Sequence, residues 1–419
     1  MRAARRDREQ GGKLGLKKGL CGIRGLGWGI LALAAASLGW ASGVHTNPLN
    51  RDPLVREAYE HFYNLDYPGA VERFERFHAM HPGDPQATTL LLDAVLFQEL
   101  YRQDLLDTTY YARDNFLTNK RQVDVPAGVR NEIESLHGRV LQMTDAEIKA
   151  NPNNKDAWFE RGYAKGLHAA FITLADHSYA AAARQGYSSR NDSEAALKLD
   201  PQYADADMAV GIQQFAVASL PGWVRVLVGI MGVGGNKERG LNLLRESAAH
   251  GVVTSVESRT ALSLFLRHDG RYGEALNVQR GLAQEYPHDF LFRLEVANLL
   301  KDQGHGLEAI AEYKQVIADG LKPGYFYGPR LQLAWFGMAD TMRGYNDIKG
   351  AAYAYTQASQ TPDSSDWLRK RALVAAGEMD DLLHDRPAAV AMYRKALAPG
   401  DQSQAEAARR GLQTPYAGK

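Results

Sequence analysis

The sequence has almost no cysteine, and this scarcity excludes several ways of stabilising or using the fold. Cys21 is the single cysteine among 419 residues. It precedes the apolar run near the N-terminus, so its position does not fit a lipid-modified cysteine. One cysteine cannot form a disulfide within the chain, and no thiol remains elsewhere for a cysteine–histidine catalytic pair.

An excess of charge of either sign is also missing. The chain has 49 lysines and arginines and 49 aspartates and glutamates, so its formal net charge is zero. Residues 1–24 hold eight of the basic residues but only two of the acidic ones, so the remainder is mildly acidic. Because no basic stripe remains beyond residue 24, we expect no nucleic-acid partner.

The motifs of common enzymes are absent too. No Gly-X-Ser-X-Gly sequence is present, and the glycine-rich residues 229–237 lack the Gly-Lys-Ser/Thr sequence of a phosphate-binding loop. Glu134 and His137 have a spacing that could place two metal ligands on one helix face, but no second acidic–histidine pair appears where a di-metal helix bundle would need it. We therefore expect a protein that is not an enzyme and has no cofactor or metal.

Residues 25–43 contain no charged side chain. A basic segment, an apolar run and then Ala41-Ser42-Gly43 is the layout of a secretory signal. The run is also close to the ~20 residues that span a bilayer. We favour a cleaved signal in residues 1–43, and an uncleaved anchor that contacts the membrane through residues 25–43 stays open. Either one places the rest of the chain outside the cytoplasm, in the periplasm or at the outer face of the cytoplasmic membrane.

The most informative pattern in the chain is a period of 34 residues. Small residues recur at the eighth and twentieth positions of each unit, and bulky residues at the seventh and eleventh. In residues 256–289 and 290–323 the small ones are Ser263, Ala275, Ala297 and Ala309. Small side chains at these positions let two antiparallel helices approach closely across a short turn. A fixed period of this length is the signature of an array of helical hairpins.

The same frame fits other parts of the chain. A unit that starts at Arg51 has, at its characteristic positions, Ala58, Ala70, Phe74 and Pro82. A unit that starts at Lys370 has Gly377, Ala389, Tyr393 and Ala396. These residues resemble the tetratricopeptide repeat (TPR) motif, and the resemblance covers roughly residues 51–400. It implies an all-α fold, a TPR-type α-solenoid in which antiparallel helical hairpins form a right-handed superhelix.

The repeat also divides the chain. We expect, after residues 1–43, N-terminal TPR-like hairpins in 44–154, irregular TPR-like units with long insertions in 155–255, regular TPR hairpins in 256–400 and a C-terminal tail in 401–419. Residues 87–101 are apolar and predict a helix, and we expect residues 104–111 to continue into a second helix. Longer helices would take up the first insertion, which falls within 170–195.

The second insertion, residues 219–235, carries Trp223 in an apolar run. The run is too short to span a bilayer, so it is either packed against the neighbouring hairpin or exposed as a docking surface. The central units and the first hairpin resemble those of exported bacterial TPR-repeat proteins. That resemblance implies an extracytoplasmic helical repeat protein and no shared chemistry.

The resemblance to TPR arrays also predicts where a partner would bind. In such arrays the first helix of each hairpin lines a concave groove. The corresponding residues of this chain include Glu257, Arg267, Leu291, Asn298, Lys301, Arg371 and Glu378. Asn298 and Lys301 are similar to the pair that clamps a peptide carboxylate in chaperone-binding TPR domains. Leu294 stands where that clamp needs a second lysine, so we expect a groove of mixed polarity without a carboxylate clamp.

Three functional hypotheses remain. The first is a non-enzymatic protein–protein interaction scaffold of the cell envelope, which binds a protein or peptide partner in the concave groove. The alternative is a structural accessory subunit of a membrane or envelope complex, docked through residues 204–255. An enzyme that uses the central insertions as its active site is the third, and no catalytic motif supports it.

Overall fold

The structure of the chain, a computed structural model, describes residues 45–110, 123–220, 234–362 and 364–418. The predictions about residues 1–43, Cys21 and Trp223 therefore lie outside the described residues. Within the described ranges the chain consists of α-helices, short 3-10 helices and connecting segments, and contains no strand.

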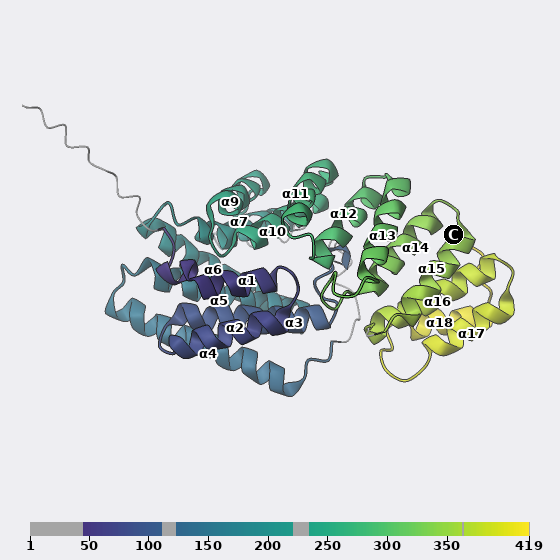
Figure 1. Cartoon of the computed structure of the whole chain (residues 1–419), viewed down its shortest axis with the longest axis horizontal. Helices are drawn as coiled ribbons and strands as arrows, with labels where there is room; N and C mark the ends of the chain where they lie inside the picture. Colours follow the sequence, from purple (N-terminus) through teal and green to yellow (C-terminus); the bar gives the residue numbers. More distant parts are fainter. Residues whose placement is uncertain (1–44, 111–122, 221–233, 363, 419) are drawn as a thin grey trace, which may run out of the picture. The chain divides into compact units, whose positions relative to one another are not determined.

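Figure 1 shows the order of these helices along the chain. Their bounds are α1 (Pro53–Phe62), α2 (Tyr67–Met80), α3 (Pro85–Arg102), α4 (Ala127–Ala150), α5 (Lys155–Leu174), α6 (Tyr179–Leu199), α7 (Asp207–Ser219), α9 (Lys237–His250), α10 (Ser255–His268), α11 (Tyr272–Glu285), α12 (Phe290–Asp302), α13 (Gly306–Gly320), α14 (Leu331–Gly344), α15 (Ile348–Gln360), α16 (Asp366–Leu382), α17 (Arg386–Ala396) and α18 (Ala405–Gln413).

Many of these helices begin at a side chain that caps their first turn. Asp84 accepts a hydrogen bond from the backbone N–H of Gln86, and Pro85 occupies the first helical position of α3. Asp289 caps α12 in the same way by accepting from Phe292. Aspartate and asparagine satisfy backbone donors that have no partner inside the helix, and each such cap is worth about 1 kcal/mol.

Successive helices pack against one another as hairpins, and small residues lie where the helices cross. Ala58, Ala70, Ala275 and Ala309 are all fully buried. A Cβ atom added to Gly240 on α9 would lie 2.7 Å from the carbonyl oxygen of Gly211 on α7. The predicted role of the small positions is therefore confirmed. The described chain has the predicted all-α architecture, a TPR-type solenoid.

The long central helices follow the prediction for the first insertion. α5 has 20 residues and α6 has 21, and the two pack along each other. The second insertion is only partly described, because residues 221–233 lie outside the described ranges. Among the helices that are described, none combines the length and the apolar composition needed to cross a bilayer.

Within the described residues, the prediction that a second helix begins at Asp104 is wrong, and the later part of that helix lies outside the described residues. Asp104 has a φ of 55°, which places it in the left-handed region, and the N–H of Leu105 bonds to the carbonyl oxygen of Leu100. This is the hydrogen bond of a Schellman C-cap, which ends a helix. Residues 105–107 have no regular secondary structure, and Thr108–Tyr110 form a short 3-10 helix. We call residues 104–109 the crossing segment.

The N-terminal helices lie beside the middle of the array. Tyr63, directly after α1, donates a hydrogen bond to Glu257 on α10, and Tyr101 on α3 donates to the carbonyl oxygen of Gly328 before α14. Figure 1 shows α1 on the side of α10. The solenoid therefore makes contacts between units that are far apart in sequence, as well as between neighbours.

The end of the chain is also structured. Residues 401–419, predicted as a tail, contain α18, which packs on α17 and α16. Ala408 on α18 is fully buried against Tyr393 and other side chains of α16 and α17. α18 thereby covers apolar side chains of the hairpin that α16 and α17 form.

Candidate functional site

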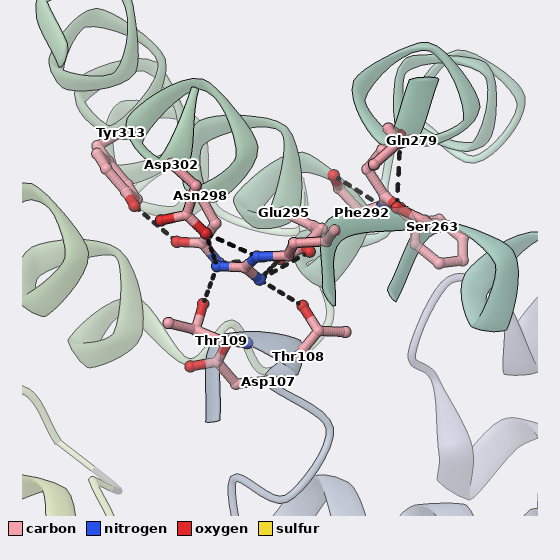
Figure 2. A network of polar contacts seen from close by, with 12 residues as sticks. Asp107, Thr108, Thr109, Ser263, Gln279, Phe292, Glu295, Asn298, Asp302 and Tyr313 are labelled. Carbon is pink, nitrogen blue, oxygen red and sulfur yellow. Dashed lines mark hydrogen bonds and ion pairs between the residues drawn. The ribbon is translucent and has the colours of Figure 1, made fainter. Parts of the chain in front are cut away.

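The inner face of α10 and α12 was predicted to hold a partner, and in the structure the crossing segment covers part of it. Arg267 on α10 donates hydrogen bonds to the hydroxyl oxygens of Thr108 at 3.1 Å and Thr109 at 3.5 Å. Figure 2 shows both threonines pointing towards Glu295 and Asn298 on the facing helix. A segment of the chain itself thus occupies this part of the predicted groove.

Arg267 is the centre of a buried polar network. Its side chain is 1% exposed and forms ion pairs with Glu295 at 2.9 Å and Asp302 at 2.6 Å. Burial alone lowers the pKa of Arg267, but the two carboxylates outweigh this effect and raise that pKa above its ordinary value. The guanidinium therefore stays charged, and its donors are used inside the chain.

Asn298 belongs to the same network. Its amide donates to Glu295 at 3.1 Å, and its oxygen accepts from the hydroxyl group of Tyr313 at 2.6 Å. The side chain is 3% exposed. In this arrangement Asn298 and Arg267 connect α10, α12 and α13, and neither presents a free polar group to a partner.

Asp104 anchors the crossing segment at its other end. Its buried carboxylate accepts from Arg330 at 2.6 Å and from Gln332 at 3.2 Å. The second carboxylate oxygen accepts from the backbone N–H of Ser365 at 3.3 Å. One side chain from the N-terminal half therefore connects the beginnings of α14 and α16.

Next to this covered region the structure has an open cleft of about 690 Å³ between α1 and α10–α11. Its lining combines tyrosines, arginines and glutamates with a few small or apolar side chains. These residues are Asn50, Arg51, Arg56, Tyr59, Glu60, Tyr63, Val252, Ser255, Val256, Arg259, Glu285 and Tyr286. We call this cavity the α1–α10 cleft.

Tyrosine rings form one side of the α1–α10 cleft. Tyr59 and Tyr63 stack at 5.4 Å between ring centroids, and Tyr63 contacts the ring of Tyr286 at 5.2 Å. Tyr63 also donates to Glu257 at 2.6 Å. Burial raises the pKa of Glu257 to about 7. The predicted groove residue Glu257 thus supports the cleft through Tyr63.

Charge on the other side of the cleft is partly unbalanced. Arg259 pairs with Glu285 at 2.5 Å, and this arginine lowers the pKa of Glu285. Arg51 and Arg56 are exposed, and neither forms an ion pair with another described residue. Two arginines beside an aromatic surface can hold a carboxylate while the rings hold an apolar side chain.

The remaining predicted residues lie elsewhere on the array. Leu291 and Lys301 are half-buried on α12. Arg371 is exposed and lies over the rings of Phe336 and Trp367. Binding by these residues stays a prediction.

The last two predicted binding features are Glu378 and the second insertion with Trp223. Glu378 is half-buried and pairs with Arg343 at 3.3 Å. Burial raises the pKa of Glu378 above its ordinary value. Trp223 lies outside the described residues, so docking through residues 204–255 also stays a prediction.

The residues that line the cleft from α1 and from the short 3-10 helix Pro48–Arg51 before it were not among the predicted binding residues. Arg51, Arg56 and Tyr59 belong to the first repeat unit, whose aromatic-rich first helix was the available signal. Their meeting with α10 could not be read from the repeat, because the frame describes contacts between neighbouring units only.

Comparison with known proteins gives matches to solved structures alone. No family model matches the chain, and no curated protein matches it. PilF of Pseudomonas aeruginosa is 16% identical with a TM-score of 0.38, over 60% of this chain and 95% of that one. Yeast Tom70 is 11% identical with a TM-score of 0.40, over 86% and 87%.

A third solved structure is a tetratricopeptide repeat protein from Parabacteroides merdae. It is 13% identical with a TM-score of 0.35, over 77% of this chain and 97% of that one. Likenesses at this level carry no inference about what the chain binds.

Proposed function

We propose that this TPR-type chain is a non-enzymatic protein–protein interaction scaffold that binds an extended segment of a partner protein in the α1–α10 cleft. The observation that carries the proposal is the contrast between two parts of the inner face. The crossing segment covers the part around Arg267, whereas the cleft remains open. Its lining includes tyrosines and two exposed arginines, Arg51 and Arg56, that form no ion pair with another described residue.

The lining indicates the chemistry of the partner. Tyr286 offers a half-buried ring that can pack against an aliphatic or aromatic side chain, and the buried rings of Tyr59 and Tyr63 support it from behind. Tyrosine is enriched in protein interfaces for this reason. Arg51 and Arg56 can form charge-assisted hydrogen bonds with a carboxylate. We therefore expect the partner's segment to carry an acidic residue close to an apolar one.

The proposed setting is outside the cytoplasm. Its support is the layout of residues 1–43, where a basic segment and an apolar run precede Ala41-Ser42-Gly43. Cell fractionation with an alkaline wash tests this part: a soluble, shortened chain supports a cleaved signal. A chain of unprocessed mass that stays in the washed membrane supports the anchor instead.

A site-specific photo-crosslinking experiment tests the cleft. A photoreactive residue replaces Val252, which is 43% exposed in the cleft, or Leu307, which is 73% exposed on α13. Crosslinking in cells of the source, followed by mass spectrometry, is expected to identify a partner from position 252 and not from position 307. The same partner from both positions would contradict the cleft as the binding site.

A double charge-reversal variant tests whether the cleft arginines contribute to binding. Arg51→Glu together with Arg56→Glu is expected to weaken the crosslink at position 252 by about 10-fold or more. The matched control is Arg239→Glu with Arg409→Glu, two exposed arginines outside the cleft. Both double variants change the net charge equally, so an equal loss in the control would rule out a specific role of the cleft arginines.

A further inference from the structure

We propose that α4 and α5 carry a binding site for a divalent transition-metal ion, formed by Glu134, His137 and His168. Each residue offers one ligand atom, and the three atoms lie within 4.8 Å of one another. The site is separate from the α1–α10 cleft, and no residue of the cleft contributes to it.

The helix geometry brings the three side chains together. Glu134 and His137 are three residues apart on α4, so they lie on the same face of that helix. His168 comes from α5, which packs against α4. Its Nε2 atom lies 3.1 Å from Glu134 Oε1. The sequence analysis dismissed the pair on α4 because it looked for a second acidic–histidine pair, whereas the third donor is a single histidine on the next helix.

The two imidazoles are packed tightly and are incompletely bonded. The rings of His137 and His168 stack at 4.2 Å between centroids with an interplanar angle of 7°. His137 is 6% exposed, and its Nε2 atom is buried without a hydrogen-bond partner in the described chain. Nδ1 of His168 is also buried without a hydrogen-bond partner in the described chain. Buried polar atoms in native proteins normally have a partner, and a metal ion would supply one.

The ligand set favours zinc or a similar ion. Two imidazoles and one carboxylate form a common zinc site that leaves one position for water. The side chain of Glu134 is 47% exposed, so the open position would face solvent. Zinc–nitrogen bonds are about 2.0–2.1 Å long in tetrahedral sites. The three ligands would therefore move closer together when the ion binds.

Nearby cations are already neutralised by carboxylates. Lys165 on α5 pairs with Asp192 at 2.6 Å and donates to Ser188. Arg130, one turn before Glu134, pairs with Asp176 at 2.8 Å. Local repulsion of a divalent ion is thereby reduced, and Glu134 adds a negative charge at the site.

Metal binding would connect two helices of successive hairpins. An ion held by Glu134, His137 and His168 fixes α4 to α5, and it stabilises the folded chain because the unfolded chain does not hold the three ligands together. The expected result is a rise in Tm when zinc is added, and a return to the initial value when a chelator removes it.

The test uses the purified full chain without a histidine tag. Isothermal titration with ZnCl₂ is expected to show one ion per chain with a Kd of about 10 µM or lower, and Co²⁺ is expected to give the visible absorption of a tetrahedral complex. Glu134→Gln and His168→Asn are expected to weaken zinc binding at least about 10-fold. Circular dichroism shows whether each variant is folded.

Two matched control variants separate the loss of a metal ligand from a general effect of substitution. Glu132→Gln changes an exposed glutamate of the same helix, and His250→Asn changes a histidine that is 69% exposed. Both are expected to bind zinc as the wild type does. Absence of saturable binding by the wild type at 100-fold the expected Kd, about 1 mM, would overturn the proposal. An equal loss in Glu132→Gln and Glu134→Gln would overturn it as well.

Discussion

Position within the repeat predicted which residues face inwards, but it did not predict what meets them there. The frame placed Arg267 and Asn298 on the inner side of the first helix of their units, and both do face the interior. Their partners include Thr108, which is 159 residues away from Arg267. A period of 34 residues describes neighbouring units, so a contact of this range leaves no periodic signal in the sequence.

Glu257 gives a prediction at the residue scale, because its pKa is raised from 4.5 to about 7 by burial. A carboxyl group whose folded-state pKa exceeds its unfolded value binds a proton more tightly in the folded state. The group therefore destabilises the fold increasingly as the pH rises from about 4.5 to about 7. Asp93 is close enough to influence this titration, and burial followed by the charge of Glu257 raises the pKa of Asp93.

Glu257→Gln is expected to remove much of this dependence. Urea unfolding of the wild type at pH 5 and pH 8 should show a lower free energy of unfolding at pH 8, by on the order of 1–3 kcal/mol for this group. The variant should show a smaller difference between the two pH values, because glutamine does not titrate and Tyr63 keeps an acceptor. An unchanged difference in the variant would assign the pH dependence to other groups.

At the scale of helices, close approach between pairs is the property that the sequence predicted best. Small residues at fixed positions indicated where two helices touch, and Gly211 and Gly240 do touch through their backbones. The prediction failed for residues 104–109. A helix was expected there, but a Schellman cap ends α3 at this point, and Asp104 forms hydrogen bonds with distant side chains.

Two glycine substitutions test this helix packing, and we expect them to change the free energy of unfolding in opposite directions. Gly240→Ala places a Cβ atom 2.7 Å from the Gly211 carbonyl oxygen and 2.8 Å from the backbone nitrogen of Phe215, so α7 and α9 must separate. We expect a loss of about 1–3 kcal/mol in the free energy of unfolding. Gly281→Ala on α11 meets no atom within 4 Å and should add about 0.5–1 kcal/mol through helix propensity.

Chemical denaturation of the two variants beside the wild type provides the comparison. Circular dichroism at equal protein concentration gives the helix content, which should stay close to that of the wild type in both. A gain in stability from Gly240→Ala, or a loss from Gly281→Ala of more than about 1 kcal/mol, would contradict the packing described for these helices.

At the scale of the whole array, contacts between distant units change what a solenoid can do. In an open array each unit contacts only its neighbours, so parts of the chain can unfold separately. Here the crossing segment and Tyr63 bond the N-terminal helices to α10, α14 and α16. The composition and the repeat predicted the all-α solenoid, and a single sequence held no evidence of this closure, because it depends on pairs such as Asp104 and Arg330.

Asp104→Ala tests whether this closure makes unfolding cooperative. The substitution leaves Arg330 buried without its carboxylate partner and removes the acceptor of Gln332, so we expect a loss of about 3–5 kcal/mol. Hydrogen exchange followed by mass spectrometry should show α1–α3 and α14–α16 opening together in the wild type. In the variant the two regions should exchange with different free energies, because the hydrogen bonds of Asp104 to the beginnings of α14 and α16 are lost. Glu274→Ala, which breaks an exposed ion pair with Arg271, should change stability by less than about 1 kcal/mol and leave the exchange pattern as it is. Identical patterns in the wild type and in Asp104→Ala would mean that contacts other than the crossing segment couple the two halves.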